Sequence, residues 1–564
     1  MSTSVNIKIG GAAGEGIKTT GLILSKSLSR LGFSIFAYDE YPSLIRGGHN
    51  TYQVYAAHER VHSQYRLIDI LVAYDLPTVT LHQNELKDSS LIILDTTKTS
   101  TPPVSKGKLL PIPLTALAQK AGGSPIMANM VSLGATLSLC GLPTTSLLDI
   151  ISQVFADKGE EIILANQKAV QAGADYVKNN FADTNLNIDL PANKKEQIVI
   201  LGNEAISVGA LAAGMKYFAS YPMTPTSNIL HFLAEQAENY NLVVNHVENE
   251  IAAINTVIGA SAAGVRAMTA TSGGGFSLMV EGLGMGGMAE VPMVIVLGTR
   301  PGPSTGMPTW TGQGDLRFAI HAAQDEFPRV VLTPGDAFET FDLTKKAFIL
   351  AEKYQMPVIL LVDKYLCESH KSGSPFPSVH QNERYGFAQN LDQTYLRYRI
   401  TEDGVSPRPL LGESGGASVM ANSYEHGEDS LVTEEAGKRQ KMQEKRLRKL
   451  ESVTKDLGEL PVFGKASATT TLVGFGSTYG PAQEALKELP EVNYLHFNYV
   501  WPFPVEQVTQ VLEKAQRIVC LEGNKLGQLQ GLIREQTGIE IKECLRKYDG
   551  RPFYPEEIAS FMKK

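Results

Sequence analysis

A glutamate at the start of an apolar segment is the first candidate for chemistry. Glu250 follows the segment HVEN and leads into IAAINTVIGASAAG, which consists almost entirely of small and apolar residues. This composition predicts a helix that packs closely on several sides, so Glu250 would lie in a buried first turn. The helix dipole favours the carboxylate there, whereas burial favours the protonated acid. A first-turn glutamate that merely caps the helix is the structural alternative.

The second candidate is the segment YPMTPTS, residues 221–227, between an apolar strand and a predicted helix. Two prolines fix this loop, and its hydroxyl groups face either a ligand or the amides that open the helix. Helix capping would explain Thr226 or Ser227, but it would not explain the Pro-x-Thr-Pro unit. We therefore expect Thr224 to face a substrate.

Two further loops follow predicted buried strands: TSGGG at 271–275 and GTRPGPSTGMPT at 298–309. In α/β folds, ligands bind at the carboxyl ends of the strands. Arg300 in the second loop could hold a substrate carboxylate through charge-assisted hydrogen bonds, and we include Ser304 and Thr305 as candidate substrate contacts. A structural or interface ion pair is the alternative role for Arg300.

The N-terminal segment contains a glycine-rich turn, GGAAGEG at 10–16, after a predicted strand and before a predicted helix. Gly11, Gly14 and Gly16 could let backbone amides approach an anionic cofactor at the positive helix end. Steric demands explain such glycines equally well, and the full dinucleotide spacing and a Walker lysine are missing. Arg46, in YPSLIRGGHN, could clamp a phosphate or carboxylate, or could be a solvated arginine in a tight turn.

The composition limits the class of protein. With 564 residues, 43% of them hydrophobic, the chain can form several domains. Its net charge of −8 argues against nucleic acid or an anionic membrane as partner. No run of eighteen apolar residues and no basic N-terminal leader occur, so we expect a cytoplasmic protein.

The four cysteines are far apart in the sequence: Cys140, Cys367, Cys520 and Cys544. No CxxC pair exists to seed a zinc site, an iron-sulfur cluster or a redox disulfide. We therefore predict no metal site in this chain and expect each thiol to be a small buried hydrophobe.

The elements that position the candidate residues have the order of a multidomain α/β protein. Strand-length apolar runs alternate with helix-period stretches, as in VNIKIG followed by IKTTGLILSKSLSRLG. This rhythm is lost between residues 383 and 460, where KRQKMQEKRLRKLES predicts a charged helix with a solvated face or a subunit contact. The predicted domains are 1–185, 195–380 and 461–564, with a linker or arm at 381–460.

In combination, these motifs resemble the α subunit of 2-oxoacid:ferredoxin oxidoreductases, in the version with the γ subunit fused at its N-terminus. YPMTPTS matches the family's substrate loop, Glu250 its pyrimidine-contacting glutamate, and TRPGPSTGMPT its arginine-bearing loop. GGAAGEGI and YPSLIRGGHN are similar to the γ portion, and GFGS and WPFP to the transketolase C-terminal fold. Met223, Thr226 and Pro301 replace a usual isoleucine, serine and glycine, which affects the shape of the expected pocket.

The resemblance implies three α/β domains: a Rossmann-like γ domain, a transketolase-like domain that binds the pyrimidine of thiamine diphosphate, and a transketolase C-terminal-like domain. It implies that Glu250 hydrogen-bonds the pyrimidine and promotes loss of the thiazolium proton. A β subunit would hold the diphosphate, the magnesium ion and the iron-sulfur cluster. In agreement, this chain has no Gly-Asp-Gly followed by the asparagine of a diphosphate motif.

The implied reaction is the oxidative decarboxylation of a 2-oxoacid to acyl-CoA and carbon dioxide. Electrons would pass through the β subunit to ferredoxin, with coenzyme A as co-substrate. Thr224 and Arg300 would hold the substrate carboxylate, and 2-oxoglutarate or pyruvate would be the substrate. The assembly that the resemblance implies is an αβ pair, doubled to (αβ)2.

The sequence is also compatible with two other functions. One is a transketolase-type or dehydrogenase-type thiamine enzyme without ferredoxin, which the γ-like N-terminal segment disfavours. The other is a non-catalytic nucleotide- or acyl-CoA-binding module. Such a module would not need YPMTPTS, Glu250 and TRPGPSTG together.

Overall fold

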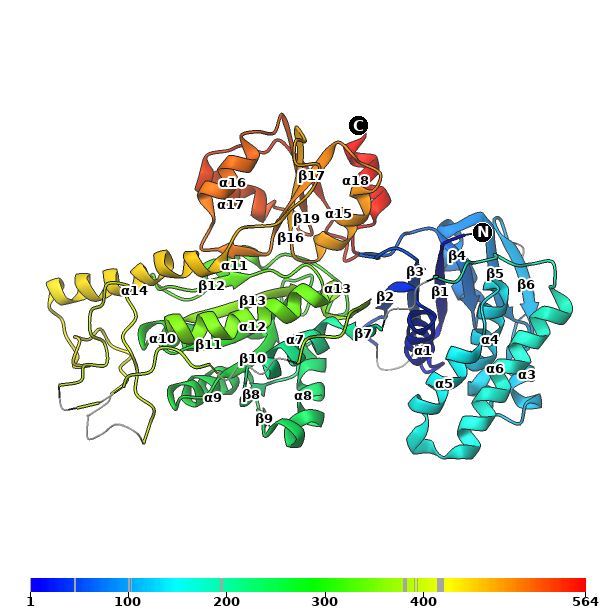
Figure 1. Ribbon diagram of the computed structural model, residues 1–564, viewed down its shortest axis with the longest axis horizontal. Coiled ribbons are helices and arrows are strands. Elements are labelled where there is room, and N and C mark those ends of the chain that lie inside the picture. The colour runs from blue at the N-terminus through cyan, green and yellow to red at the C-terminus, as the bar shows by residue number, and fades with distance from the viewer. Residues whose placement is uncertain are drawn as a thin grey trace. The chain divides into compact units, whose positions relative to one another are not determined.

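The computed structural model describes residues 2–44, 47–99, 102, 104–192, 196–378, 383–389, 391–392, 394–412 and 420–564. Strands of these residues form three sheets, each accompanied by helices (Figure 1). The chain divides into two compact units, which are described separately. Unit 1 comprises Met1–Leu201, Ser369–Phe376 and Tyr554–Lys564, and unit 2 comprises Gly202–Glu368 and Pro377–Phe553.

Unit 1 contains an eight-stranded sheet in the order β6-β5-β4-β1-β3-β2-β14-β7. Strands β1, β4, β5 and β6 are parallel, and the pairs from β1 to β7 through β3, β2 and β14 are antiparallel. The strands are β1 Ser4–Ala12, β2 Ser34–Glu40, β3 His49–Ala57, β4 Ile68–Ala73, β5 Leu86–Asp95, β6 Lys108–Ile112, β7 Ile198–Leu201 and β14 Ser369–Gly373. The helices are α1 Ile17–Arg30, α2 Leu76–His82, α3 Leu114–Lys120, α4 Ala128–Cys140, α5 Thr145–Val154, α6 Glu160–Asn180 and α18 Pro555–Met562.

The outer part of this sheet comes from distant segments of the chain. Strand β14 pairs with both β2 and β7, and β7 lies at the start of the range 195–380 that was predicted as the second domain. The compact units are therefore interrupted in sequence, whereas the domains predicted from the sequence were contiguous ranges. Strand pairing joins segments that are distant in sequence, so a domain boundary inferred from local composition cannot show which strands share a sheet.

Unit 2 contains a seven-stranded sheet in the order β18-β12-β13-β11-β10-β8-β9, parallel except for the β12–β18 pair. Strands β10, β11 and β13 are completely buried, which explains the long apolar runs of β11 and β13, whereas β10 alternates apolar residues with Thr and Ser. The strands are β8 Tyr217–Ser220, β9 Val243–His246, β10 Ala267–Ser272, β11 Met293–Thr299, β12 Val330–Leu332, β13 Pro357–Asp363 and β18 Tyr499–Trp501. The helices are α7 Gly202–Ala212, α8 Ser227–Tyr240, α9 Glu250–Ala262, α10 Gly273–Met288, α11 Leu316–His321, α12 Ala337–Tyr354 and α13 Lys364–Cys367.

The C-terminal part of unit 2 forms a five-stranded sheet in the order β15-β17-β16-β19-β20. Its segment β18 joins the seven-stranded sheet, and buried apolar residues of both parts form one continuous hydrophobic core. The predicted multidomain α/β fold is confirmed. The remaining elements are β15 Val462–Gly464, β16 Thr470–Phe475, β17 Val492–Phe497, β19 Arg517–Glu522, β20 Glu543–Arg546, α15 Tyr479–Leu486, α16 Val505–Leu512 and α17 Gln528–Thr537.

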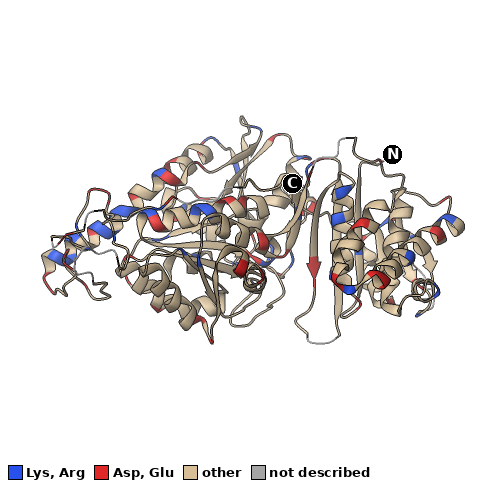
Figure 2. Ribbon diagram, turned by 60° about the horizontal axis from the view of Figure 1, so that its bottom comes forward, with Lys and Arg blue, Asp and Glu red and all other residues tan. Residues whose placement is uncertain are grey.

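The charged segment forms helix α14, Ala436–Leu457, whose Lys and Arg residues are visible in Figure 2. Several of these residues are buried rather than solvated. Lys445 Nζ lies 2.6 Å from Glu290 Oε1, and Lys449 also contacts Glu290. Burial would raise the pKa of Glu290, but these two lysines hold it well below its ordinary value. The basic residues therefore bind α14 to its own unit, because the i, i+4 spacing turns both lysines toward one carboxylate.

Candidate functional site

Glu250 is the first residue of α9 and is only 3% exposed. The preceding Asn249 caps this helix, because its side-chain oxygen accepts a hydrogen bond from the Ala252 amide at 2.9 Å. Glu250 therefore does not cap this helix, so the structural alternative to a functional role does not apply to it. Its Oε1 atom is buried and has no hydrogen-bond partner among the described residues. A buried oxygen of this kind needs a donor, which a ligand can supply.

The glycine-rich start of α10 leaves room for this carboxyl group. A Cβ atom built on Gly275 would lie 2.8 Å from Glu250 Cδ, and closer still to Glu250 Oε1 and Thr271 Oγ1. Only glycine fits here without displacing Glu250. The hydroxyl groups of Thr271 and Ser272, at the carboxyl end of β10, are also buried without a partner among the described residues. The unsatisfied oxygens of Glu250 and Thr271 thus lie together beside Gly275, at the edge of the sheet where α/β folds bind ligands.

Arg300 and Thr224, 76 positions apart, are in direct contact: Arg300 Nη1 donates a hydrogen bond to the Thr224 carbonyl oxygen at 2.7 Å. The turn that carries Thr224 is held on both sides. Asn203 Nδ2 donates to the Pro225 carbonyl at 2.8 Å, and the Thr226 hydroxyl donates to the Met223 carbonyl at 3.0 Å. Thr226 therefore closes the turn and does not cap α8. Arg300 keeps further N–H groups that could hold a carboxylate.

Asp315 belongs to the same site but was not predicted from the sequence. Its Oδ2 atom lies 2.7 Å from the position of a Cβ built on Gly273, at the start of α10. Burial raises the pKa of Asp315 from 3.8 to about 6, and the positive charge of Arg300 opposes this rise. Burial also lowers the pKa of Arg300, while Asp315 raises it. Near neutral pH an ionised Asp315 can orient the Arg300 guanidinium.

The shifted pKa of Asp315 predicts a pH-dependent stability. Because the folded state favours the protonated acid, its contribution is complete below pH 3.8 and is lost as pH rises through about 6. We expect Asp315→Asn to remove this loss. The variant should be about 1–3 kcal/mol more stable than wild type above pH 6 and similar to it near pH 4. Urea denaturation of both proteins from pH 4 to pH 8 measures this; a difference independent of pH would contradict it.

The loop that carries Ser304 and Thr305 is exposed at those two residues. Their hydroxyl groups form no hydrogen bond within the described part of the chain. The same loop is fixed further on, where Gln313 Nε2 donates to Asp363 at 3.2 Å and to the Phe475 carbonyl at 3.0 Å. No hydrogen bond among the described residues joins Ser304 or Thr305 to Arg300, and their role as substrate contacts stays a prediction.

The N-terminal glycine turn lies in unit 1 between β1 and α1. Gly11 is buried, with Tyr74 Cβ only 3.1 Å from the position of an added Cβ, so packing alone accounts for it. Gly14 is exposed with open space around it, and Gly16 has the left-handed φ of 75° that allows α1 to begin. Glu15 closes the turn by accepting a hydrogen bond from the Ala12 amide at 3.1 Å.

The second N-terminal motif lies beside this turn. The Ala13 amide donates to the Gly48 carbonyl at 3.2 Å, which connects the two predicted segments, although Arg46 itself lies outside the described residues. His49 begins a series of polar side-chain contacts that the sequence did not indicate. His49 Nε2 lies 2.8 Å from His82 Nε2, and His82 Nδ1 lies 3.1 Å from Glu85. Burial, with His82, lowers the pKa of His49 to about 4.

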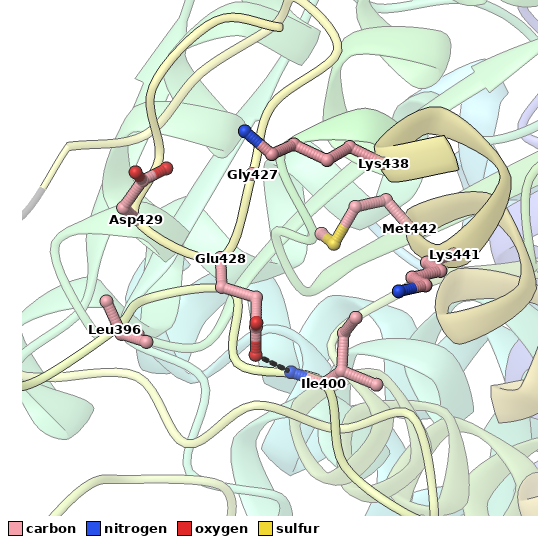
Figure 3. Close-up of a pocket in the computed structure, with 8 residues that line it drawn as sticks. All are labelled: Leu396, Ile400, Gly427, Glu428, Asp429, Lys438, Lys441 and Met442. Carbon is pink, nitrogen blue, oxygen red and sulfur yellow. Dashed lines mark hydrogen bonds between the residues drawn. The ribbon is translucent and has the colours of Figure 1, made fainter. Parts of the chain in front are cut away.

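A cavity of about 380 Å³ lies against α14, remote in sequence from the candidate residues (Figure 3). It is lined by Leu396, Ile400, Gly427, Glu428, Asp429, Lys438, Lys441 and Met442. The Ile400 amide donates to Glu428 at 2.8 Å. None of the residues predicted from the sequence lines this cavity, so it is not the candidate site.

Comparison with known proteins identifies the family. Residues 208–445 match the family model described as "Pyruvate flavodoxin/ferredoxin oxidoreductase, thiamine diP-bdg", and residues 6–176 match "Pyruvate ferredoxin/flavodoxin oxidoreductase". The α subunit of a 2-oxoacid:ferredoxin oxidoreductase from Sulfolobus sp is 33% identical over 99% of this chain and 96% of that protein. The chain belongs to the 2-oxoacid:ferredoxin oxidoreductase α-subunit family.

Other relatives agree with this assignment. The 2-oxoglutarate oxidoreductase subunit KorA of Mycobacterium tuberculosis is 29% identical, covering 99% of this chain and 91% of that protein. A solved structure of the 2-oxoglutarate:ferredoxin oxidoreductase from Magnetococcus marinus, with 2-oxoglutarate, coenzyme A and succinyl-CoA bound, superposes with a TM-score of 0.94. It is 31% identical and covers 100% of this chain and 99% of its own.

The predicted family and function are thereby confirmed. The protein is the α subunit, with a fused N-terminal γ portion, of a thiamine-diphosphate-dependent 2-oxoacid:ferredoxin oxidoreductase. Relatives that carry the name of an α subunit imply a partner subunit. Within the described residues, no helix combines the length and apolarity needed to cross a membrane.

Proposed function

We propose that Glu250 holds the aminopyrimidine of thiamine diphosphate in a site completed by the β subunit. The observation that carries this proposal is the buried Oε1 atom of Glu250, which has no partner among the described residues and faces the space that Gly275 leaves free. A protonated ring nitrogen would be a suitable donor for this oxygen. When bound, thiamine diphosphate supplies a carbon nucleophile for attack on a ketone. Glu250 would hold and exchange the proton at the pyrimidine nitrogen.

We further propose that Arg300 and Thr224 bind the substrate carboxylate, with Ser304 and Thr305 as additional contacts from the loop. The contact between Arg300 and the Thr224 carbonyl supports the pairing of the two loops. The charge of Asp315, which interacts with that of Arg300, would help to orient the guanidinium. We infer 2-oxoglutarate, or 2-oxoacids more broadly, as substrate, because relatives named 2-oxoglutarate synthase and the 2-oxoglutarate-bound structure support it.

The remaining parts of the reaction are proposed from the family. The products would be acyl-CoA and carbon dioxide, with coenzyme A as acyl acceptor. A β subunit would bind the diphosphate, the magnesium ion and the iron-sulfur cluster, and would pass electrons to ferredoxin in an (αβ)2 assembly. Gly14, Gly16 and Arg46 would contact an anionic part of a cofactor. The open space at Gly14 supports this for the turn.

Reconstitution tests the proposed function. We expect the purified chain alone to show no 2-oxoacid oxidation, since it supplies only the pyrimidine side of the site. Mixing it with the β subunit should give ferredoxin reduction that requires 2-oxoglutarate, coenzyme A and thiamine diphosphate together. Robust coenzyme-A-dependent turnover by the isolated chain would overturn the divided site.

Replacing Arg300 tests the carboxylate contact. We expect Arg300→Ala to raise KM for the 2-oxoacid by about tenfold to a hundredfold, because charge-assisted hydrogen bonds are lost. Arg300→Lys should rescue only partly, since a point charge replaces a fork of N–H groups. Steady-state kinetics of the assembled enzyme, with the thermal midpoint as a control for folding, provide the measurement. If Arg300→Ala left the kinetics of every accepted 2-oxoacid unchanged, Arg300 would have only a structural role.

A further inference from the structure

Two cysteines that are 24 positions apart are neighbours in the C-terminal sheet. Cys520 on β19 is the direct register partner of Cys544 on the parallel strand β20. Register partners project their side chains to the same face of a sheet, and residues i and i+2 share that face. Glu522 therefore lies on the face of both thiols. The ligand atoms of Cys520, Glu522 and Cys544 all lie within 4.8 Å of one another.

The carboxylate of this cluster is held rigidly. Glu522 is completely buried, and its oxygens accept hydrogen bonds from the Leu529 amide at 2.8 Å and the Gln530 amide at 2.9 Å, at the start of α17. Asn524 Nδ2 donates a third hydrogen bond at 2.8 Å. The Cys520 thiol donates to Glu522 Oε1 at 3.2 Å. Once the Cys520 thiol loses its proton, the lone pair of Glu522 Oε1 that accepted this hydrogen bond can bind a cation instead.

The carboxylate of this cluster favours a metal ion over a disulfide. A disulfide would remove the proton that the Cys520 thiol donates to Glu522 Oε1 and would put nothing in its place, whereas a cation can bind all three groups. Two thiolates on one metal ion, with bonds of about 2.3 Å, bring their sulfurs only to about 3.8 Å, which the strand spacing accommodates.

We propose that Cys520, Cys544 and Glu522 bind a thiophilic divalent cation of the zinc class. Binding would release the two thiol protons to solvent, so that two thiolates and one carboxylate surround the ion with a net charge of −1. Arg546 is the register partner of Glu522 on β20, so it lies on the same face, and its positive charge can balance this charge. Cys544 is only partly buried, which leaves the fourth position open to water. The ion would join the four-residue edge strand β20 to β19.

Cobalt binding tests the site. We expect the reduced full-length chain to bind one Co²⁺ per chain, with the absorption band of thiolate-to-cobalt charge transfer, and Zn²⁺ to displace it. Zn²⁺ should also raise the thermal midpoint. The charge-transfer band and the Zn²⁺-induced rise of the thermal midpoint should both disappear in Cys544→Ala and in Cys520→Ala. The matched control is Cys140→Ala, which removes a buried thiol of unit 1 and should keep both effects.

Cys544→Ala is the decisive variant, because its partly exposed side chain can be removed with little risk to folding. Retention of the charge-transfer band in folded Cys544→Ala would overturn the site. Failure of the wild-type chain to bind Co²⁺ saturably would do the same, and so would a Cys520–Cys544 disulfide that forms in air in a chain without cobalt affinity.

Discussion

Glu250→Gln should lower turnover of the assembled enzyme by about a hundredfold to ten-thousandfold, the range for losing a general acid-base group. Glutamine keeps the size of the side chain and can still hydrogen-bond, but it cannot exchange a proton with the pyrimidine nitrogen. Thiamine diphosphate should therefore still bind while turnover fails. Turnover at saturating cofactor, together with a cofactor-binding titration, separates the two effects.

The matched control is Glu248→Gln, two positions earlier. Glu248 is exposed, whereas Glu250 is buried, and the chemical change is the same in both variants. We expect Glu248→Gln to retain turnover near that of wild type. An equal loss in both variants would point to a general effect on the segment before α9, and would remove the specific role of Glu250.

Gly275→Ala should be nearly as damaging, although it introduces only one methyl group. The new Cβ would occupy the space of the Glu250 carboxyl group and the Thr271 hydroxyl. Overpacking of this kind costs about 1–3 kcal/mol of stability, and displacement of a catalytic group by about 1 Å can cost a hundredfold in rate. We expect turnover to fall by about a hundredfold while the protein still folds.

Gly274→Ala provides the comparison, because Gly274 is in the same helix and has no atom within 4 Å of an added Cβ. This substitution should leave turnover unchanged, and a methyl group in place of glycine should favour the helix slightly. The assay is turnover of both variants alongside their thermal midpoints. If Gly275→Ala were as active as Gly274→Ala, the close approach of α10 to Glu250 would not matter for function.

The sequence predicted residues whose environment depends mainly on their own segment. The small and apolar residues after Glu250 indicated a closely packed helix, and the structure buries Glu250 at its first turn. Buried parallel strands could be predicted for the same reason, since β11 and β13 consist largely of continuous apolar residues. The pairing of Arg300 with Thr224 could be expected only as a meeting of two loops at one sheet edge.

Features that depend on contacts between distant segments could not be predicted. Asp315 and Gly275 acquire their roles from neighbours on other elements, and a single carboxylate or glycine gives no local signal of this. Cys520 and Cys544 are far apart in the sequence and form no CxxC pair, but the parallel strands β19 and β20 place them in register, which the sequence did not indicate. The charged helix was expected to have a solvated face or a subunit contact. Its Lys445 and Lys449 instead contact Glu290, which lies 155 positions before Lys445.

Deuterium exchange at the thiazolium carbon of bound thiamine diphosphate tests the central claim most directly. The measurement compares wild type, Glu250→Gln and Glu248→Gln in the complex with the β subunit, at saturating cofactor in deuterated solvent. If Glu250 promotes loss of that proton, exchange should slow by about a hundredfold or more in Glu250→Gln and remain unchanged in Glu248→Gln. Wild-type exchange in Glu250→Gln would contradict the account.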